Sequence, residues 1–239
     1  MLPAYKPHTP CVVVYDLDDV LVQTQTAAVQ AFAHCFAANL DITYDEAEHL
    51  TLNYFHQHGD STRYMAERFG KDDAWIAKCQ HDIHQRLIDQ AAGFVMPDQP
   101  LRQQLEHAGA AGHTQAVLTF SQNNYAHHML GLAGIRPLFV PELVLTHQCV
   151  EGHSKRTPEP YLRLLQRLTH VAASHPHIMV EDQPGNLKPA AQLGFTTVLV
   201  GEAARANTDG FIHARYPRVH DFLTAFLAGT FTPNLEHAA

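Results

Sequence analysis

The sequence lacks the features that would assign it to several specialised classes of protein. It has no run of about 18 apolar residues, which a membrane-spanning helix needs, so we expect no membrane partner. Lysine and arginine number 16 against 24 acidic residues, and the net charge of −8 argues against a nucleic-acid-binding face. The first ten residues hold three prolines and no apolar segment, so we expect no signal peptide.

Cysteine is scarce and scattered, and the histidines form no metal-binding pattern. The four cysteines include no C-x-x-C pair: Cys11, Cys35, Cys79 and Cys149. We therefore predict reduced, packed thiols in a cytoplasmic protein rather than a disulfide or zinc framework. The 19 histidines include no H-E-x-x-H pattern, so we do not predict a histidine metal site.

The chain has the composition of a globular protein. Its 239 residues are 46% hydrophobic and 17% charged, which is enough apolar surface to offset the entropy of ordering the chain. The length allows one large domain or one domain with a sizeable insertion.

Four short apolar runs predict strands that are buried on both faces, and residues 143–145 are a weaker fifth candidate. The four runs cover residues 11–15, 116–120, 178–182 and 196–200. Helical patterns follow at residues 122–132, 158–168 and 185–193, with Ser121 and Thr157 as expected N-caps and Gly194 as an expected C-terminal glycine. This alternation predicts an α/β fold, a Rossmann-like parallel sheet flanked by helices.

Residues 22–98 have a different pattern, because they contain no strand-like run. An apolar stripe near Phe32 and Phe36 has helical spacing, Thr43 and Glu46 fit a capping box, and residues 61–69 and 72–90 are further helical windows. We predict an all-helical domain over residues 22–98, inserted into an α/β core domain of residues 1–21 and 99–239. The two links between them are expected to act as hinges.

Polar side chains follow the predicted strands at the point where each strand ends. They are Asp16 with Asp18, Thr119, Lys155, and Glu181 with Asp182. Alternate residues leaving a strand point the same way, so two carboxylates can face one pocket, where a divalent cation such as Mg²⁺ relieves their repulsion. Each signal alone also has an ordinary structural explanation, such as a turn, a strand residue or a solvated lysine.

Taken together and in this order, these segments resemble the haloacid dehalogenase (HAD) superfamily of phosphohydrolases. The four segments that match its motifs are residues 12–21, 117–119, 155–161 and 180–186. The resemblance covers nearly the whole chain, and it implies a HAD-like core whose helical insertion is a cap domain. It also implies a phosphatase that acts on a small phosphorylated metabolite.

The resemblance further implies a role for each site residue. Asp16 attacks phosphorus and forms an aspartyl-phosphate, while Asp18 protonates the leaving oxygen and then deprotonates the attacking water. Thr119 and Lys155 bind the nonbridging phosphate oxygens. An acid two residues after the nucleophile favours phosphate esters over haloacids, because a halide leaves without a proton.

The same resemblance implies a Mg²⁺ site. Its ligands are the Asp16 carboxylate, the Asp18 backbone carbonyl and Asp182, with Glu181 as a direct ligand or as a support for one.

Two residues depart from the superfamily's pattern. Phe120 follows Thr119 where a small polar residue is common, so that only its backbone amide can serve phosphate. Arg156 follows Lys155 where proline is usual, which leaves open that the two basic residues exchange roles.

Two short segments resemble a pyrimidine 5′-nucleotidase-like branch. They are residues 54–59 with Thr62, and residues 182–186. A nucleotide base would then stack on aromatic residues of the cap, although packing in the cap core explains these residues as well. The aromatic candidates are Tyr54, Phe55, Tyr64 and Phe69.

Other functions remain open from the sequence. Within the superfamily these are a sugar phosphatase, a phosphoglycolate phosphatase and a phosphomutase. Outside it, a receiver-like phosphoacceptor module would not need the long helical insertion, and a Mn²⁺-dependent glycosyltransferase would not need Glu181 and Asp182. A non-catalytic scaffold would need none of the carboxylates. The sequence indicates no oligomeric state.

Overall fold

The structure is a computed structural model that describes residues 9–55, 61–169 and 175–234. The chain divides into two compact units, which we call the α/β unit (Met1–Val22 with Pro97–Ala239) and the helical unit (Gln23–Met96). The helical unit falls within the range 22–98 that the sequence suggests for an insertion.

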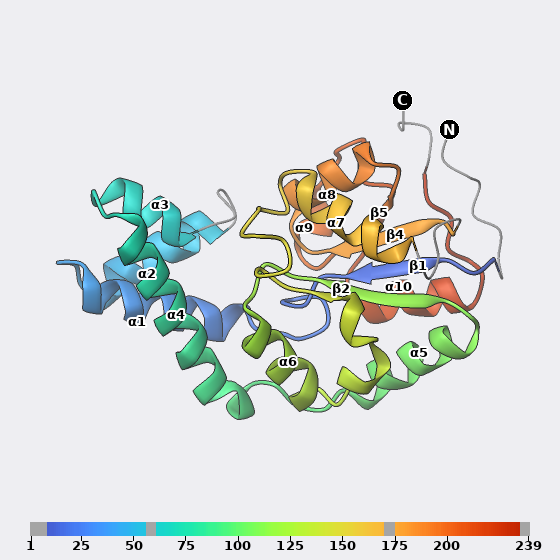
Figure 1. The fold of residues 1–239 in the computed structure, drawn as a ribbon, viewed down its shortest axis with the longest axis horizontal. Coiled ribbons are helices and arrows are strands. Elements are labelled where there is room, and N and C mark those ends of the chain that lie inside the picture. The colour runs from blue at the N-terminus through green and yellow to red at the C-terminus, as the bar shows by residue number, and fades with distance from the viewer. Residues whose placement is uncertain (1–8, 56–60, 170–174, 235–239) are drawn as a thin grey trace. The chain divides into compact units, whose positions relative to one another are not determined.

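Six parallel strands form the sheet of the α/β unit, in the order β3-β2-β1-β4-β5-β6 (Figure 1). They are β1 (Val12–Tyr15), β2 (Thr114–Leu118), β3 (Val144–Leu145), β4 (His177–Glu181), β5 (Thr196–Val200) and β6 (Ala214–Tyr216). Every residue of β1 is buried, as expected for a strand covered on both faces. The predicted α/β fold with a Rossmann-like parallel sheet is confirmed.

Helices cover both faces of this sheet. In Figure 1, α7 (Glu159–Leu168), α8 (Pro184–Gln192) and α9 (Ala203–Ala206) lie on one face. On the other face lie α5 (Gln99–Ala110), α6 (Asn123–Leu132) and α10 (Val219–Leu227). Two short 3₁₀ turns, η2 (Arg136–Leu138) and η3 (Pro141–Leu143), precede β3. Val12 and Val14 of β1 share a core cluster with Tyr161 and Leu164 of α7, so alternate residues of the strand anchor this helix layer.

The central strands end level with one another. Tyr15 at the end of β1 pairs with Val117 of β2 and with Val180 of β4. The residues that follow Tyr15, Leu118 and Val180 are therefore brought to one edge of the sheet, which is where parallel α/β sheets place their functional groups.

Strand β6 and two helix starts differ from the predictions. The sequence of β6, Ala-Arg-Tyr, has no apolar run, because β6 lies at the sheet edge where two of its three residues are only half-buried. Neither Ser121 nor Thr157 is an N-cap: α6 begins after Gln122 and α7 after Pro158. Their hydroxyls have other partners, since Ser121 donates to Asp18 and Thr157 donates to the Ser154 carbonyl.

The helical unit consists of α1 (Gln25–Asn39), α2 (Tyr44–Phe55), α3 (Ser61–Arg68), α4 (Asp73–Gln90) and the 3₁₀ turn η1 (Ala91–Gly93). Asp72 caps α4 by accepting a hydrogen bond from the backbone amide of Trp75 at 2.9 Å. The ring of Phe36 stacks on that of Trp75 with 6.2 Å between the centroids. The unit thus has an apolar core of its own, built around Phe36 and Met65.

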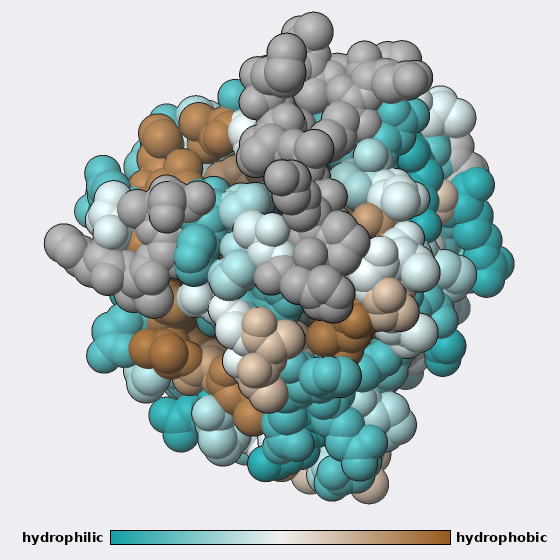
Figure 2. Space-filling view, turned by 90° about the vertical axis from the view of Figure 1, so that its right-hand side faces the viewer, coloured by the Kyte–Doolittle hydropathy of each residue, from teal (hydrophilic) through white to brown (hydrophobic). Residues whose placement is uncertain are grey.

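Two features of the structure bear on contact with a membrane. Among the described residues, no helix combines the length and apolar character needed to cross a membrane. Figure 2 views the side of the molecule on the right of Figure 1, from which β1 and β2 start. Where its atoms are not grey, hydrophobic residues lie in separate groups among hydrophilic and neutral ones.

All four cysteines are free thiols.

Candidate active site

Three of the predicted site residues come directly from the ends of central strands. Asp16 follows β1, Thr119 follows β2, and Glu181 is the last residue of β4. The backbone amide of Asp16 donates to the Val180 carbonyl at 2.9 Å, and that of Thr119 donates to the Leu145 carbonyl at 2.9 Å. The interstrand hydrogen bonds therefore continue up to the site and fix where these side chains start.

Lys155 joins two of the acidic residues from the loop that precedes α7. Its Nζ atom lies 2.7 Å from Asp16 Oδ2 and 2.9 Å from Glu181 Oε2. The three residues are almost fully buried, with exposed fractions of 5% for Lys155, 6% for Asp16 and 0% for Glu181. Sequence reasoning thus selected residues that the fold brings into direct contact.

Arg156 occupies a different place from Lys155. Its guanidinium lies against Gly185 at the start of α8, so closely that a Cβ atom at Gly185 would be 3.2 Å from Arg156 Nε. Lys155 is therefore the basic residue found in contact with Asp16, and its role in phosphate binding stays a prediction.

The electrostatics of the cluster show an excess of negative charge. Burial, together with the charge of Glu181, raises the pKa of Asp16 well above its usual value, and Lys155 only partly opposes this. Burial alone would lower the pKa of Lys155, but the charges of Asp16 and Glu181 outweigh it and raise that pKa. Burial also raises the pKa of Asp182 to about 8, with a further contribution from the charge of Asp16.

Asp16, Glu181 and Asp182 form a compact group of carboxylates. Each offers one oxygen, and these oxygens lie within 4.8 Å of one another; no other group of three potential metal ligands is found among residues 9–55, 61–169 and 175–234. One oxygen of Glu181 accepts from Lys155 and the other from Asn186 Nδ2.

The hydroxyl of Thr119 is oriented by its neighbour. Its Oγ1 atom accepts a hydrogen bond from the backbone amide of Ser121 at 3.1 Å. Since one lone pair is used in this way, the hydroxyl proton is left to donate elsewhere. The ring of Phe120 packs edge-on against His147, with 4.8 Å between ring centroids, so its side chain is engaged in packing.

The carboxylate of Asp18 accepts hydrogen bonds from two hydroxyl groups. Its Oδ2 accepts from Ser121 Oγ at 2.9 Å, and its Oδ1 accepts from the Tyr125 hydroxyl at 2.7 Å. The chain then turns sharply, since Asp19 has a φ of +58° and its amide donates to the Val22 carbonyl. Sequence reasoning missed Tyr125, because a tyrosine within an amphipathic helix carries no signal of a distant partner.

The predicted base-stacking residues belong to the helical unit. Tyr64 and Phe69 pack against its core, and Thr62 is buried. The side chains of Tyr54 and Phe55 and residues 56–59 lie outside the described part of the chain.

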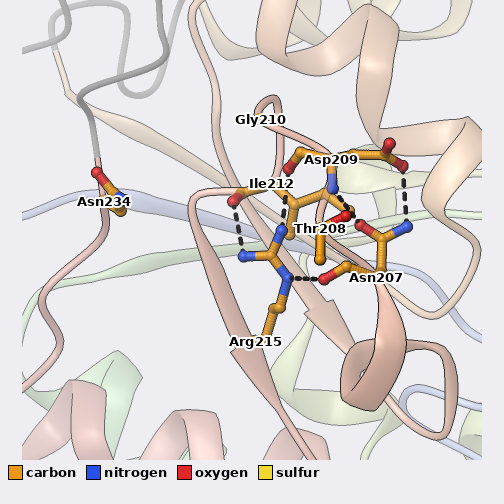
Figure 3. Close-up of a pocket in the computed structure, with 7 residues that line it drawn as sticks. All are labelled: Asn207, Thr208, Asp209, Gly210, Ile212, Arg215 and Asn234. Carbon is orange, nitrogen blue, oxygen red and sulfur yellow. Dashed lines mark hydrogen bonds between the residues drawn. The ribbon is translucent and has the colours of Figure 1, made fainter.

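A separate pocket of about 270 Å³ lies in the segment that leads into β6 (Figure 3). Its centre is Arg215, whose three guanidinium nitrogens donate to the carbonyls of Asn207, Asp209 and Ile212. The positive charge of Arg215 therefore holds this loop together. The segment precedes β6, so it lies at the end of the sheet where the parallel strands begin. The acidic cluster lies at the other end, where the strands finish.

Comparisons with known proteins agree on the fold. CbbY from Rhodobacter sphaeroides in complex with phosphate superimposes with a TM-score of 0.71 at 19% identity, covering 90% of this chain and 96% of that one. A CbbY mutant in complex with xylulose-(1,5)-bisphosphate gives 0.70 at 18% identity, covering 89% and 96%. A HAD family hydrolase from Deinococcus radiodurans R1, with bound phosphate and sodium, gives 0.59 at 22% identity, covering 94% and 98%.

No curated protein sequence matches the chain. The model of the haloacid dehalogenase-like hydrolase family matches residues 13–200, which span both units. The prediction of a HAD-type hydrolytic enzyme is therefore confirmed, and the chain belongs to the haloacid dehalogenase-like hydrolase family.

Proposed function

We propose that this enzyme is a Mg²⁺-dependent phosphomonoester hydrolase in which Asp16 is the nucleophile. The observation that supports this most strongly is that Asp16, Thr119 and Asp182 follow the ends of neighbouring parallel strands, while Lys155, from the loop before α7, lies 2.7 Å from Asp16. A carboxylate, a hydroxyl and an ammonium at one point are the groups that phosphoryl transfer needs, because its catalysis consists mostly of positioning and charge stabilisation.

The reaction begins with attack of an Asp16 oxygen on phosphorus. A bond forms from Asp16 to phosphorus as the bond to the leaving oxygen breaks, and Asp18 gives that oxygen its proton. Asp18 then takes a proton from water as the water attacks the aspartyl-phosphate, which releases phosphate and restores Asp16. Lys155 and the proton of the Thr119 hydroxyl bind nonbridging oxygens during both steps.

The residues present fit a bound Mg²⁺. Three carboxylates share the site with one ammonium, so the formal charge is 1 − 3 = −2, which one Mg²⁺ neutralises. The donor set is all oxygen, as Mg²⁺ prefers. We assign the Asp16 carboxylate, Asp182 and the Asp18 backbone carbonyl as ligands, and Glu181 as the residue that holds Lys155. When bound, the cation supplies charge neutralisation for the phosphoryl group.

The substrate is then a small phosphorylated metabolite, and two classes compete. A pyrimidine nucleoside 5′-monophosphate is supported by the resemblance of residues 182–186 to nucleotidases. A sugar phosphate is supported by the structural likeness to CbbY, a mutant of which is in complex with xylulose-(1,5)-bisphosphate.

A phosphate-release assay separates these proposals. The purified chain is incubated with p-nitrophenyl phosphate, UMP, CMP, sugar phosphates and phosphoglycolate, each with and without Mg²⁺. Mg²⁺-dependent release that is lost in Asp16→Asn supports the phosphatase. Preference for UMP and CMP supports the proposal of a nucleotidase, and preference for a sugar phosphate contradicts that proposal. A single phosphorylation without turnover contradicts the proposal, since that is the behaviour of a receiver module.

A further inference from the structure

The two aspartates that leave β1 have partners of different kinds. Asp16 is paired with the ammonium of Lys155, whereas the Asp18 carboxylate accepts from the hydroxyls of Ser121 and Tyr125. We propose that Tyr125, assisted by Ser121, is a positioning residue that aims the Asp18 carboxyl group at the leaving oxygen of the substrate. This inference rests on the proposed phosphatase function.

The contacts fix Asp18 in a way that a single hydrogen bond does not. Tyr125 donates to Oδ1 at 2.7 Å and Ser121 donates to Oδ2 at 2.9 Å. One donor on each oxygen determines the plane of the carboxyl group, whereas one donor alone leaves that plane free to rotate about χ2, which is a soft torsion in aspartate.

The position of Tyr125 makes it a rigid donor. It lies in the first turn of α6 and is 1% exposed, so its ring has little freedom. A buried phenol needs a polar partner, and the Tyr125 hydroxyl donates to Asp18, which lies 107 positions earlier in the chain. The hydroxyl therefore ties the start of α6 to the loop after β1.

Ser121 connects the same aspartate to the phosphate-binding side of the site. Its hydroxyl donates to Asp18, and its backbone amide donates to Thr119 Oγ1. A short segment of three residues thus orients both the candidate proton donor and the candidate phosphate-binding hydroxyl. This also explains why Ser121 does not cap α6.

Ser121 and Tyr125 contact Asp18 through hydroxyls, whereas Lys155 contacts Asp16 through an ammonium. A hydroxyl can donate to an oxygen of a carboxylate and equally to the carbonyl oxygen of a carboxylic acid, which leaves the proton of the acid free to point at the substrate. The contact to Tyr125 therefore persists whether or not Asp18 carries a proton, and the orientation of the carboxyl group is kept through both steps of the reaction.

If the Asp18 carboxyl group is no longer oriented toward the leaving oxygen, the kinetic constants change in a specific way. The proton from Asp18 matters for an alkyl phosphate, whose alkoxide is a poor leaving group, and matters little for p-nitrophenyl phosphate, whose phenolate leaves without one. The ratio kcat/KM reports steps up to formation of the aspartyl-phosphate, so later use of Asp18 as a base does not enter it.

The test compares kcat/KM for glycerol 2-phosphate and p-nitrophenyl phosphate in the full chain with Mg²⁺. Tyr125→Phe keeps the ring and removes the hydroxyl, and we expect a loss of about tenfold or more on glycerol 2-phosphate against less than about threefold on p-nitrophenyl phosphate. Ser121→Ala is expected to show the same pattern. Tyr216→Phe, which removes a hydroxyl at edge strand β6, is the matched control and should leave both values unchanged.

The double variant Asp18→Asn/Tyr125→Phe tests whether Tyr125 acts through Asp18. We expect it to match Asp18→Asn within about twofold on glycerol 2-phosphate, because residues that act as a unit are not additive. Equal losses on the two esters in Tyr125→Phe, or a full additional loss in the double variant, would overturn the inference. If the wild-type chain releases phosphate from neither ester, the proposed function itself fails, and the role of Tyr125 fails with it.

Discussion

The Nζ atom of Lys155 lies 2.7 Å from the Oδ2 atom of Asp16, and both side chains are buried. In its anionic form a buried carboxylate needs a partner, and this one shares its ammonium with Glu181. The pair holds the candidate nucleophile at the end of β1 and places a positive charge where the phosphate oxygens would be bound.

Replacement of Asp16 by asparagine should abolish phosphate release while leaving the fold intact. The amide keeps the size of the side chain but cannot form an aspartyl-phosphate, so we expect a loss of at least about a thousandfold in kcat. Asp89→Asn, at an exposed position of α4, is the control and should retain full activity. Retention of activity by Asp16→Asn would show that Asp16 is not the nucleophile.

Replacement of Lys155 by methionine should destabilise the protein. It leaves Asp16 and Glu181 buried without their cation, and breaking a buried ion pair costs about 3–5 kcal/mol. Adding Glu181→Gln removes one of the two unpaired buried charges, so the double variant should recover part of the lost stability. Urea unfolding in metal-free buffer measures both effects. A double variant less stable than Lys155→Met would show that Glu181 does not depend on Lys155.

Lys155 and Arg156 should differ in their effects on activity. Lys155→Met loses the group that contacts Asp16, and we expect kcat to fall by about a hundredfold or more. Arg156→Met removes a guanidinium that lies against Gly185, and we expect less than about a tenfold loss. Steady-state kinetics with p-nitrophenyl phosphate decides between them, and the reverse order would exchange the roles of the two residues.

The stability of the metal-free protein should depend on pH through Asp182. Its pKa rises from 3.8 to about 8 on folding, so between these values the native state binds more protons than the unfolded chain. The free energy of unfolding therefore falls as the pH rises from about 4 to about 8, and the loss is complete above that range. Mg²⁺ should reverse it, because the cation stabilises the ionised form.

The variant Asp182→Asn isolates this effect. It removes the charge that burial penalises, so the metal-free variant should melt above the metal-free wild type at pH 8, by about 2–4 °C for each kcal/mol regained. Addition of Mg²⁺ should raise the Tm of the wild type and not that of the variant. A variant that responds to Mg²⁺ like the wild type would place the cation elsewhere.

The sequence was sufficient to predict the central strands and the residues at their ends, because buried parallel strands have a distinct apolar pattern. It was not sufficient to predict the hydrogen-bond partners of those residues. Ser121 has the local signature of an N-cap, yet its hydroxyl donates to Asp18, 103 residues away in the chain. Tyr125 and the edge strand β6 were missed for a related reason, since their roles depend on contacts that no local pattern encodes.

Chemical trapping of the covalent intermediate tests the central claim most directly. The wild-type chain is quenched with borohydride during turnover of p-nitrophenyl phosphate in Mg²⁺, which reduces an aspartyl-phosphate to homoserine, and the peptides are sequenced by mass spectrometry. The account predicts homoserine at position 16 only when substrate is present. An unmodified Asp16 in an enzyme that turns over, or homoserine at another aspartate, would contradict it.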